Sequence, residues 1–103
     1  MANQEAFSIL SQVAIDLTSL FQAELTTQGL VESGRLRDSV KWIVIPTTDG
    51  GFTLQMESLD YFKFLDDKFN ISQNVFNSST YANIQEQIAN AYSLIILDDL
   101  FLT

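Results

Sequence analysis

The chain opens with a long stretch in which apolar residues recur every three or four positions. Between about residues 4 and 27 this stripe contains Phe7, Leu10, Ala14, Leu17, Phe21 and Leu25, widened by Ile9, Val13 and Leu20. Polar residues fall on the opposite side, which is the 3.6-residue period of a half-buried helix. Asn3 suits the cap at its start, and Gly29 suits its end because glycine adopts the left-handed conformation at little cost. The pattern therefore predicts a helix over residues 4–27.

Residues 39–57 alternate between apolar and polar, as the two strands of a hairpin do. One face carries Val40, Trp42 and Val44 from the first strand and Phe52, Leu54 and Met56 from the second. Pro46 ends the first strand because it cannot donate to the ladder, and Asp49-Gly50 is a turn signal. Matching the apolar faces places Val44 opposite Leu54, Trp42 opposite Met56 and Lys41 opposite Glu57.

The second half of the chain predicts a short helix, a loop and another long helix. Residues 58–69 form the short helix, with Tyr61, Phe64, Leu65 and Lys68 on one face. Residues 70–79 lack a period and predict a loop, with a short edge strand at Val75-Phe76 as an alternative. The second long helix spans residues 80–97 approximately, with Ser79 or Thr80 as its cap. Its apolar stripe contains Tyr81, Ile84, Ile88, Ala91 and Ile95. Residues 94–102 are apolar nearly all round, so they either fold back on the sheet or pack on another subunit.

These elements predict an α+β fold, in which an antiparallel β-hairpin-based sheet packs against long N-terminal and C-terminal helices. A length of 103 residues suits one domain, 1–103, with a single core. We expect Trp42, Leu54 and Met56 to be buried in that core together with Phe7, Leu10, Leu17, Ile84 and Ile88.

The composition is short of charge. Apolar residues make up 47% of the chain and charged residues only 17%, whereas about 25% is usual. This balance favours a subunit that buries part of its surface against other chains. The alternative is an ordinary domain in which Ser, Thr, Asn and Gln replace charged residues.

The charge that remains is strongly acidic, with a net charge of −8 from thirteen acids and five bases. A surface of this kind does not bind nucleic acid through its phosphates, so we expect no sequence-specific nucleic-acid binding. It is compatible with lining a passage that DNA must traverse without being held. The chain also lacks the basic leader of a signal peptide, an apolar run long enough to span a bilayer, and bases on the polar side of its first helix. We expect synthesis in the cytosol and no membrane partner.

No residue pattern suggests catalysis or a cofactor. The chain has no His and no Cys, which removes the commonest general base and the commonest transition-metal ligands. A Gly-rich phosphate loop is absent as well. Asp60, Asp66 and Asp67 are candidate oxygen ligands for a divalent cation, but no Gly follows Phe52 to shape a binding loop. We therefore expect no enzyme activity, no cofactor and no metal.

Some residues have no evident use inside the predicted core and are candidates for contacts between subunits. They are Arg35, Arg37, Ile43, Ile45, Asp49, Gly50, Leu100, Phe101 and Leu102, together with loop 70–79. Arg35 and Arg37 form a positive spot that can dock an acidic neighbour. The alternative for these two arginines is local pairing with Glu32 and Asp38.

Two segments resemble motifs of a known family. Ser33-Gly34-Arg35-Leu36-Arg37-Asp38-Ser39-Val40 has the form Ser/Thr-Gly-x-Leu-x-x-Ser-hydrophobic, and Tyr61-Phe62-Lys63-Phe64-Leu65-Asp66 resembles a second motif in shape. With the order of helices and hairpin around them, they resemble the small tail-completion or head–tail joining proteins of tailed bacteriophages. The chain departs from that family at Phe62, where a small residue is usual, at Asp67-Lys68, where a Gly is usual, and in lacking the Pro that often precedes the first motif.

The resemblance implies a structural virion protein. Its subunits would form a ring of six or twelve copies in the neck, with the portal or connector protein on one side and the tail tube or another tail protein on the other. Assembly would take place in the cytoplasm of the host bacterium. The alternative from another class is a small acidic protein-binding module or inhibitor, including a DNA mimic.

Overall fold

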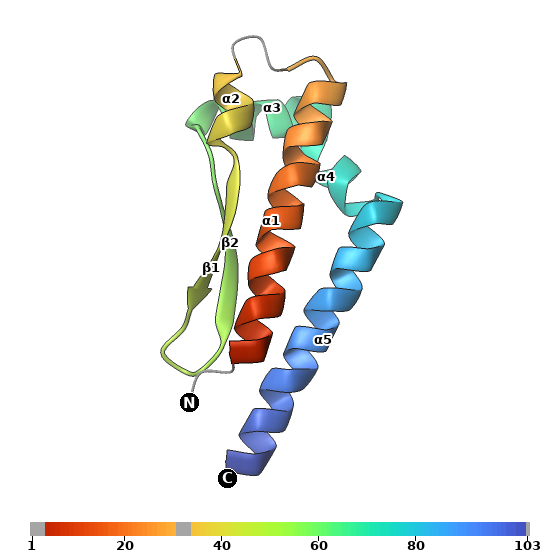
Figure 1. Ribbon diagram of the computed structural model, residues 1–103. Helices are drawn as coiled ribbons and strands as arrows, with labels where there is room; N and C mark the ends of the chain where they lie inside the picture. Colours follow the sequence, from red (N-terminus) through yellow and green to blue (C-terminus); the bar gives the residue numbers. More distant parts are fainter. Residues whose placement is uncertain (1–3, 31–33, 103) are drawn as a thin grey trace.

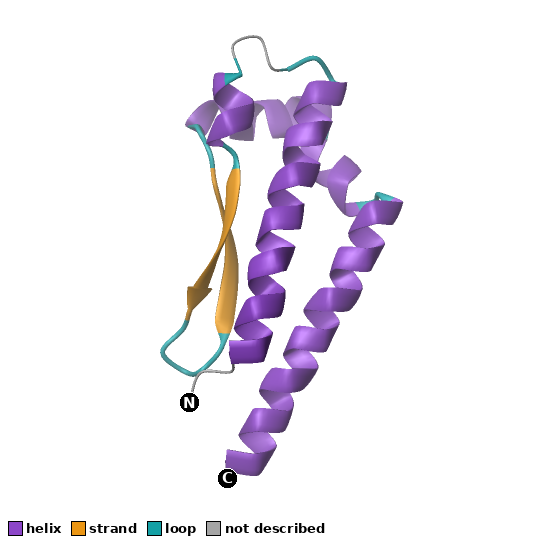
Figure 2. Cartoon of the chain, viewed as in Figure 1, coloured by secondary structure: helices purple, strands orange, loops and turns teal. Residues whose placement is uncertain are grey.

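The computed structural model describes residues 4–30 and 34–102, and the side chains of residues 96–102 are not included in that description. The elements follow one another as α1 (Gln4–Thr27), α2 (Arg35–Ser39), β1 (Lys41–Pro46), β2 (Phe52–Glu57), α3 (Asp60–Phe69), α4 (Ile71–Phe76) and α5 (Ser79–Leu102). The two strands form an antiparallel sheet that packs with the two long helices (Figures 1 and 2). The predicted α+β fold is confirmed.

The molecule is elongated, and α1 lies at its centre. Its principal extents are 52 × 26 × 19 Å. Figure 1 shows α1 between the hairpin and α5, with α2 and α3 gathered at one end and the C-terminus of α5 at the other. The core follows α1 and has two clusters, whose buried members are Val13, Leu17, Phe21, Leu25, Val40, Phe62, Leu65, Ile71, Val75 and Ile84 in the larger and Ala6, Leu10 and Ala91 in the smaller.

The predicted first helix is confirmed over its full length, because Gln4–Thr27 coincides with residues 4–27. Its end has the hydrogen bonds expected of a glycine stop. Gly29 has φ 71°, its N–H donates to the carbonyl of Thr26, and the N–H of Leu30 donates to the carbonyl of Leu25. This pair of bonds satisfies two of the carbonyls that a helix end leaves open. The proposed cap, Asn3, lies outside the described residues.

The predicted hairpin register is also confirmed, since Val44 pairs with Leu54, Trp42 with Met56 and Lys41 with Glu57. Side chains of α1 bond the outer edge of β1. The N–H of Trp42 donates to Oγ1 of Thr18 at 2.8 Å, and Nε2 of Gln22 donates to the carbonyl of Val40 at 3.3 Å. These bonds fix the hairpin against α1 and occupy backbone groups that an edge strand otherwise exposes.

The loop predicted at residues 70–79 is wrong, because residues 71–76 form α4 and no edge strand is present at Val75-Phe76. Asn70 separates α3 from α4 with a left-handed conformation at φ 55°. Asp66 then caps α4 from the preceding helix, accepting bonds from the N–H and from the hydroxyl of Ser72, both at 2.6 Å. Residues 71 and 75 are buried, so one apolar pair four residues apart was the only periodic signal that this short helix could give.

Residues 35–39 form the short helix α2, for which no helix was predicted. The predicted face of α3 is wrong in part, since Phe62 and Leu65 are buried while Tyr61 and Phe64 are exposed. The second long helix runs further than predicted, from Ser79 to Leu102. Its cap is neither Ser79 nor Thr80: the N–H of Tyr81 donates to the hydroxyl of Ser78 at 3.2 Å.

The predicted core is partly correct. Leu10, Leu17 and Ile84 are buried, whereas Trp42, Leu54, Met56 and Ile88 pack on the core while remaining half-buried. Phe7 was predicted to be buried and is 42% exposed. Its ring meets Phe52 at 5.7 Å, but it lies in the first turns of α1, where the hairpin covers only one side.

Phe21 is the residue on which most of the aromatic packing converges. It has no exposed surface, and its ring centroid lies 5.5 Å from the ring centroid of Trp42, 6.1 Å from that of Phe62 and 5.7 Å from that of Phe76.

We expect Phe21→Ala to lower the free energy of unfolding by about 3–5 kcal/mol, because it leaves a cavity between three elements. Urea unfolding followed by circular dichroism measures the loss. Ile15→Ala, on the exposed side of the same helix, is the control, and a loss from Phe21→Ala as small as the control's would contradict this packing.

Asp66 supplies a second stability test, because it caps α4 through Ser72. We expect Asp66→Ala to cost about 1–2 kcal/mol, the range for removing a helix cap. Asp67→Ala removes the same charge from a neighbouring exposed position and should cost far less. Chemical unfolding of the two variants makes the comparison, and equal losses would remove the capping role from Asp66.

Candidate functional site

The structure places the predicted contact residues at several separate positions. Arg35 and Arg37 lie on α2, at one end of the molecule. Nε of Arg37 pairs with Oδ1 of Asp38 at 3.1 Å, which agrees with local pairing for this arginine. Arg35 is exposed and lines a pocket described below. The two arginines therefore have different surroundings.

Ile43 and Ile45 alternate with the core-facing residues of β1, so they lie on the hairpin face opposite Trp42 and Val44. Ile43 is half-buried and Ile45 is 37% exposed. The described elements leave Ile45 only partly covered. Leu100, Phe101 and Leu102 belong to the last turn of α5, but their side chains lie outside the described part of the chain.

Asp49 and Gly50 form the tip of the hairpin. Gly50 has φ 88°, a conformation that favours glycine. The hydroxyl of Thr47 donates to Oδ1 of Asp49, and the N–H of Gly51 donates to the same oxygen at 3.2 Å. These two bonds lower the pKa of Asp49 below the ordinary value of an aspartate, and the bond from Thr47 makes the larger contribution. The tip is a closed turn whose hydrogen bonds are made within itself.

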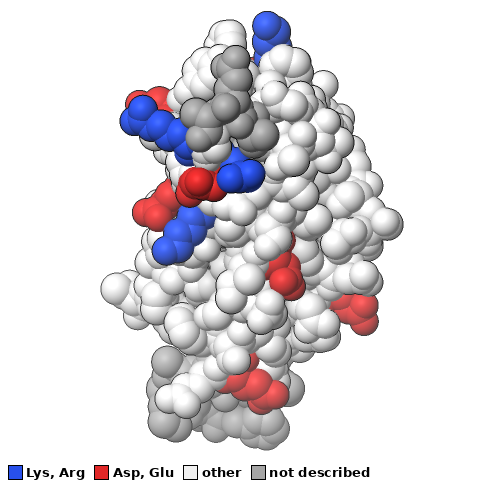
Figure 3. Space-filling view, turned by 45° about the horizontal axis from the view of Figure 1, so that its top comes forward, with Lys and Arg blue, Asp and Glu red and all other residues white. Residues whose placement is uncertain are grey.

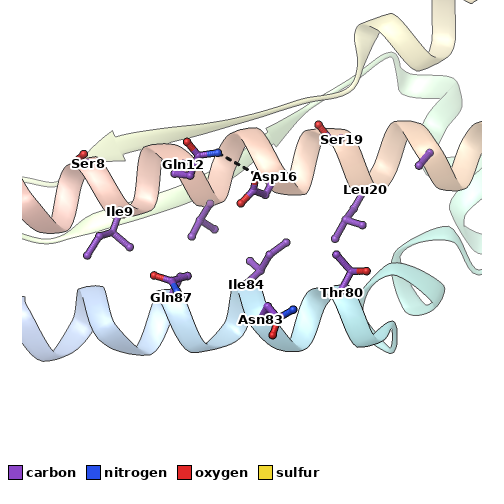
Figure 4. Close-up of a pocket in the computed structure, with 12 residues that line it drawn as sticks. Ser8, Ile9, Gln12, Asp16, Ser19, Leu20, Thr80, Asn83, Ile84 and Gln87 are labelled. Carbon is purple, nitrogen blue, oxygen red and sulfur yellow. Dashed lines mark hydrogen bonds between the residues drawn. The ribbon is translucent and has the colours of Figure 1, made fainter.

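A groove with a volume of about 890 Å³ lies between α1 and α5. Figure 4 shows Ile9 and Leu20 pointing from α1 toward α5, and Ile84 pointing back toward α1. The rest of the lining is largely polar and uncharged, consisting of Ser8, Gln12, Ser19, Thr80, Asn83 and Gln87 with the apolar Val13 and Ala23. Asp16 is its one charged group and accepts a bond from Gln12 at 3.0 Å. An apolar floor with a hydroxyl and amide rim suits a protein segment better than an ionic ligand.

The sequence prediction missed a second surface, formed by the end of α1, α2 and α3. A pocket of about 440 Å³ is lined there by Gly29, Leu30, Arg35, Leu36, Leu59, Tyr61 and Leu65. Beside it the rings of Tyr61 and Phe64 stack at 5.8 Å with an interplanar angle of 17°, and both are more than half exposed. An aromatic pair next to an arginine has the composition of interface hot spots. The signal in the sequence was the apolar surplus of α3, which has more large side chains than one buried face can hold.

The acids proposed as cation ligands do not converge. Within the described residues, no group of three or more acidic side chains is placed to hold a metal ion. Both carboxylate oxygens of Asp66 are already bonded to Ser72, and Asp60 and Asp67 are exposed on α3. Asp66 therefore has a structural role, which is to cap α4.

By length and apolar composition alone, α1 could cross a membrane. Core helices meet the same criterion, and α1 has seven buried side chains that pack within the protein. Its apolar stripe is accounted for by the fold.

Comparison with known proteins found no family model, no curated protein and no solved structure that matches the chain.

The hairpin tip gives a test that is independent of any partner. We expect Asp49 to titrate at lower pH than an ordinary aspartate, because the Thr47 hydroxyl and the Gly51 N–H stabilise the carboxylate. The stabilisation is complete above the pKa of the unfolded chain and is lost as pH falls through the lower pKa of the folded state. Thr47→Val should move the pKa of Asp49 upward in an NMR titration, while Thr48→Val should leave it in place. An unchanged pKa in Thr47→Val would contradict the geometry of this turn.

Proposed function

We propose that the protein is a non-catalytic structural subunit of a tailed-bacteriophage virion. It forms a ring with copies of itself in the neck and joins the head, through the portal or connector, to the tail. Three features support the proposal: the two motif segments that resemble the tail-completion family, an order of helices and hairpin that agrees with the layout of that family, and large apolar side chains exposed on the described surface.

The exposed apolar surface carries this proposal. Among the residues whose side chains the structure describes, seven large hydrophobic ones are exposed, namely Phe7, Ile15, Ile45, Tyr61, Phe64, Phe76 and Tyr92. They come from α1, β1, α3, α4 and α5, so they are spread over several faces. A ring subunit needs two different contact patches, because a head-to-tail interface joins unlike surfaces. A spread of apolar side chains, with few charges between them, suits several contacts better than one.

The charge distribution suits a passage for DNA. Figure 3 shows the bases gathered around the end where α2 and α3 lie, with acids scattered over the rest of that face. All five bases, Arg35, Arg37, Lys41, Lys63 and Lys68, fall within residues 35–68. Tight binding of duplex DNA would need these bases in a stripe without acids between them. A net charge of −8 lets DNA pass without being held.

The acidic inhibitor remains the competing proposal. A DNA mimic would array its acids along one face at the spacing of phosphates, whereas the acids on the face that Figure 3 shows are scattered and mixed with bases. The placement of charge on this face therefore favours the structural role. An inhibitor would also leave virion assembly intact when it is removed, which separates the two proposals by experiment.

The test is a nonsense mutation early in the gene, in the phage that encodes this chain. A neck subunit should be required for joining, so we expect lysates with DNA-filled heads and separate tails under the electron microscope. Infectious titre should fall by orders of magnitude and recover when the wild-type chain is supplied from a plasmid. A chain carrying Phe21→Ala is a useful second complement, because it should restore titre less well at raised temperature. Normal virions without the protein would exclude the proposed function.

A further inference from the structure

The two ends of the molecule are too far apart to meet within one chain. Phe62 and Leu65 of α3 share a cluster with Phe21 and Leu25, near the end of α1. At the other end, Ala91 of α5 packs with residues at the start of α1. A helix of 24 residues, the length of α1, is about 36 Å long. The C-terminus of α5 therefore lies at the opposite end from α2 and α3, as Figure 1 shows.

The last part of α5 extends beyond the body of the protein. From Ala91 the helix continues to Leu102, a further distance of about 16 Å. Leu94 and Ile95 still pack on the smaller core cluster, and the sequence after them, residues 96–102, contains five apolar residues and two acids, Asp98 and Asp99. Acids at the C-terminal end of a helix are disfavoured by its dipole, and no base lies in the last turn of α5. A helical end of this composition needs both an apolar recess and a cation.

The pocket at the opposite end offers both. Four leucines, Leu30, Leu36, Leu59 and Leu65, line it with Tyr61, and Arg35 is the one charged residue in its described lining. Lys68 follows Tyr61 and Phe64 at helical spacing on α3 and supplies a second cation at this end of the molecule, where its Nζ lies 5.5 Å from the centroid of the Phe69 ring. A guanidinium has five donors and can bond a carboxylate in addition to the contacts that it makes within its own chain.

We propose that the C-terminal end of α5 of one copy docks in the α2–α3 pocket of the next copy. Leu100, Phe101 and Leu102 supply the apolar anchor against the leucines and the stacked aromatic pair. Asp98 and Asp99 pair with Arg35 and Lys68 of the neighbour. The inference rests on the proposed function, because it specifies the contact by which copies join. It is a head-to-tail contact, which closes into a ring when the rotation between copies allows it.

The groove between α1 and α5 is a poorer acceptor for this segment. Its one charged group is Asp16, which would face the acids of the incoming helix and repel them. Its rim is made of hydroxyl and amide groups, which an apolar helix end leaves without partners. Charge complementarity therefore selects the α2–α3 pocket over the larger groove.

The experiment uses two full-length variants that each lose one half of the contact. The tail variant carries Leu100→Asp and Phe101→Asp, and the pocket variant carries Tyr61→Asp and Phe64→Asp. The control carries Gln85→Asp and Asn90→Asp, which alter exposed polar side chains of α5 and add the same charge. Circular dichroism first checks that the three variants unfold at similar temperatures. Sedimentation velocity then measures assembly over a wide range of protein concentration.

We expect the wild type and the control to assemble with rising concentration. The tail and pocket variants should each stay monomeric, with a dissociation constant raised about 30-fold or more, as for loss of an interface hot spot. An equimolar mixture of the two should form a dimer and stop there, because it retains one intact tail and one intact pocket. A two-fold contact of tail with tail, or of pocket with pocket, would not show this complementation.

A charge exchange provides the second measurement if a doubly substituted variant fails to fold. Arg35→Glu should weaken assembly, and adding Asp98→Arg and Asp99→Arg should restore it in part. A mixture that stays monomeric, or variants that assemble like the wild type, would overturn this docking while leaving ring formation through another surface in place. A wild type that stays monomeric at all concentrations would also overturn this docking. Electron microscopy of lysates tests the proposed role in the neck separately.

Discussion

The fold depends on one constraint, which is that α1 must be covered on two sides at once. The aromatic contact of Phe21 with Trp42 fixes the hairpin side, and the inward side chains of Ile9, Leu20 and Ile84 define the α5 side. A single hairpin is marginally stable in water, and an isolated amphipathic helix depends on packing for most of its stability. Each element is therefore stabilised by α1, and α1 is stabilised by both. Near the start of α1 the three meet, where Ala6 and Ala91 are small enough to let the backbones approach.

Much of this arrangement could be predicted from the sequence, because the long elements repeat their pattern often enough to be recognised. The hairpin register followed from two apolar faces and one turn, and a slip by one residue would have put Trp42 opposite Gln55. The first helix gave many repeats before Gly29 ended it. The short helices could not be predicted in this way. α4 has six residues, and its cap, Asp66, comes from the preceding helix, so its stabilisation depends on tertiary structure.

The candidate surfaces were harder to predict than the fold. Arg35 and Arg37 looked alike in sequence, yet the first lines an apolar pocket and the second pairs with Asp38. The exposure of Tyr61 and Phe64 depended on which side of α3 turned inward, and Phe62 took that position because it reaches Phe21. Aromatic spacing alone did not separate these possibilities. A surface that combines apolar groups with few charges still follows from composition, since 17% charged residues cannot cover a molecule of this elongated shape.

The single tryptophan of the chain gives this molecule a built-in optical reporter. Trp42 is bonded through its backbone to Thr18, and its indole Nε1 is buried without a hydrogen-bond partner among the described residues. It lies on β1, and its ring contacts Phe21 of α1 at 5.5 Å between ring centroids. Its emission therefore reports whether the hairpin is seated on α1. Folding and association can thus be followed as separate signals in one sample, by tryptophan fluorescence and by scattered light.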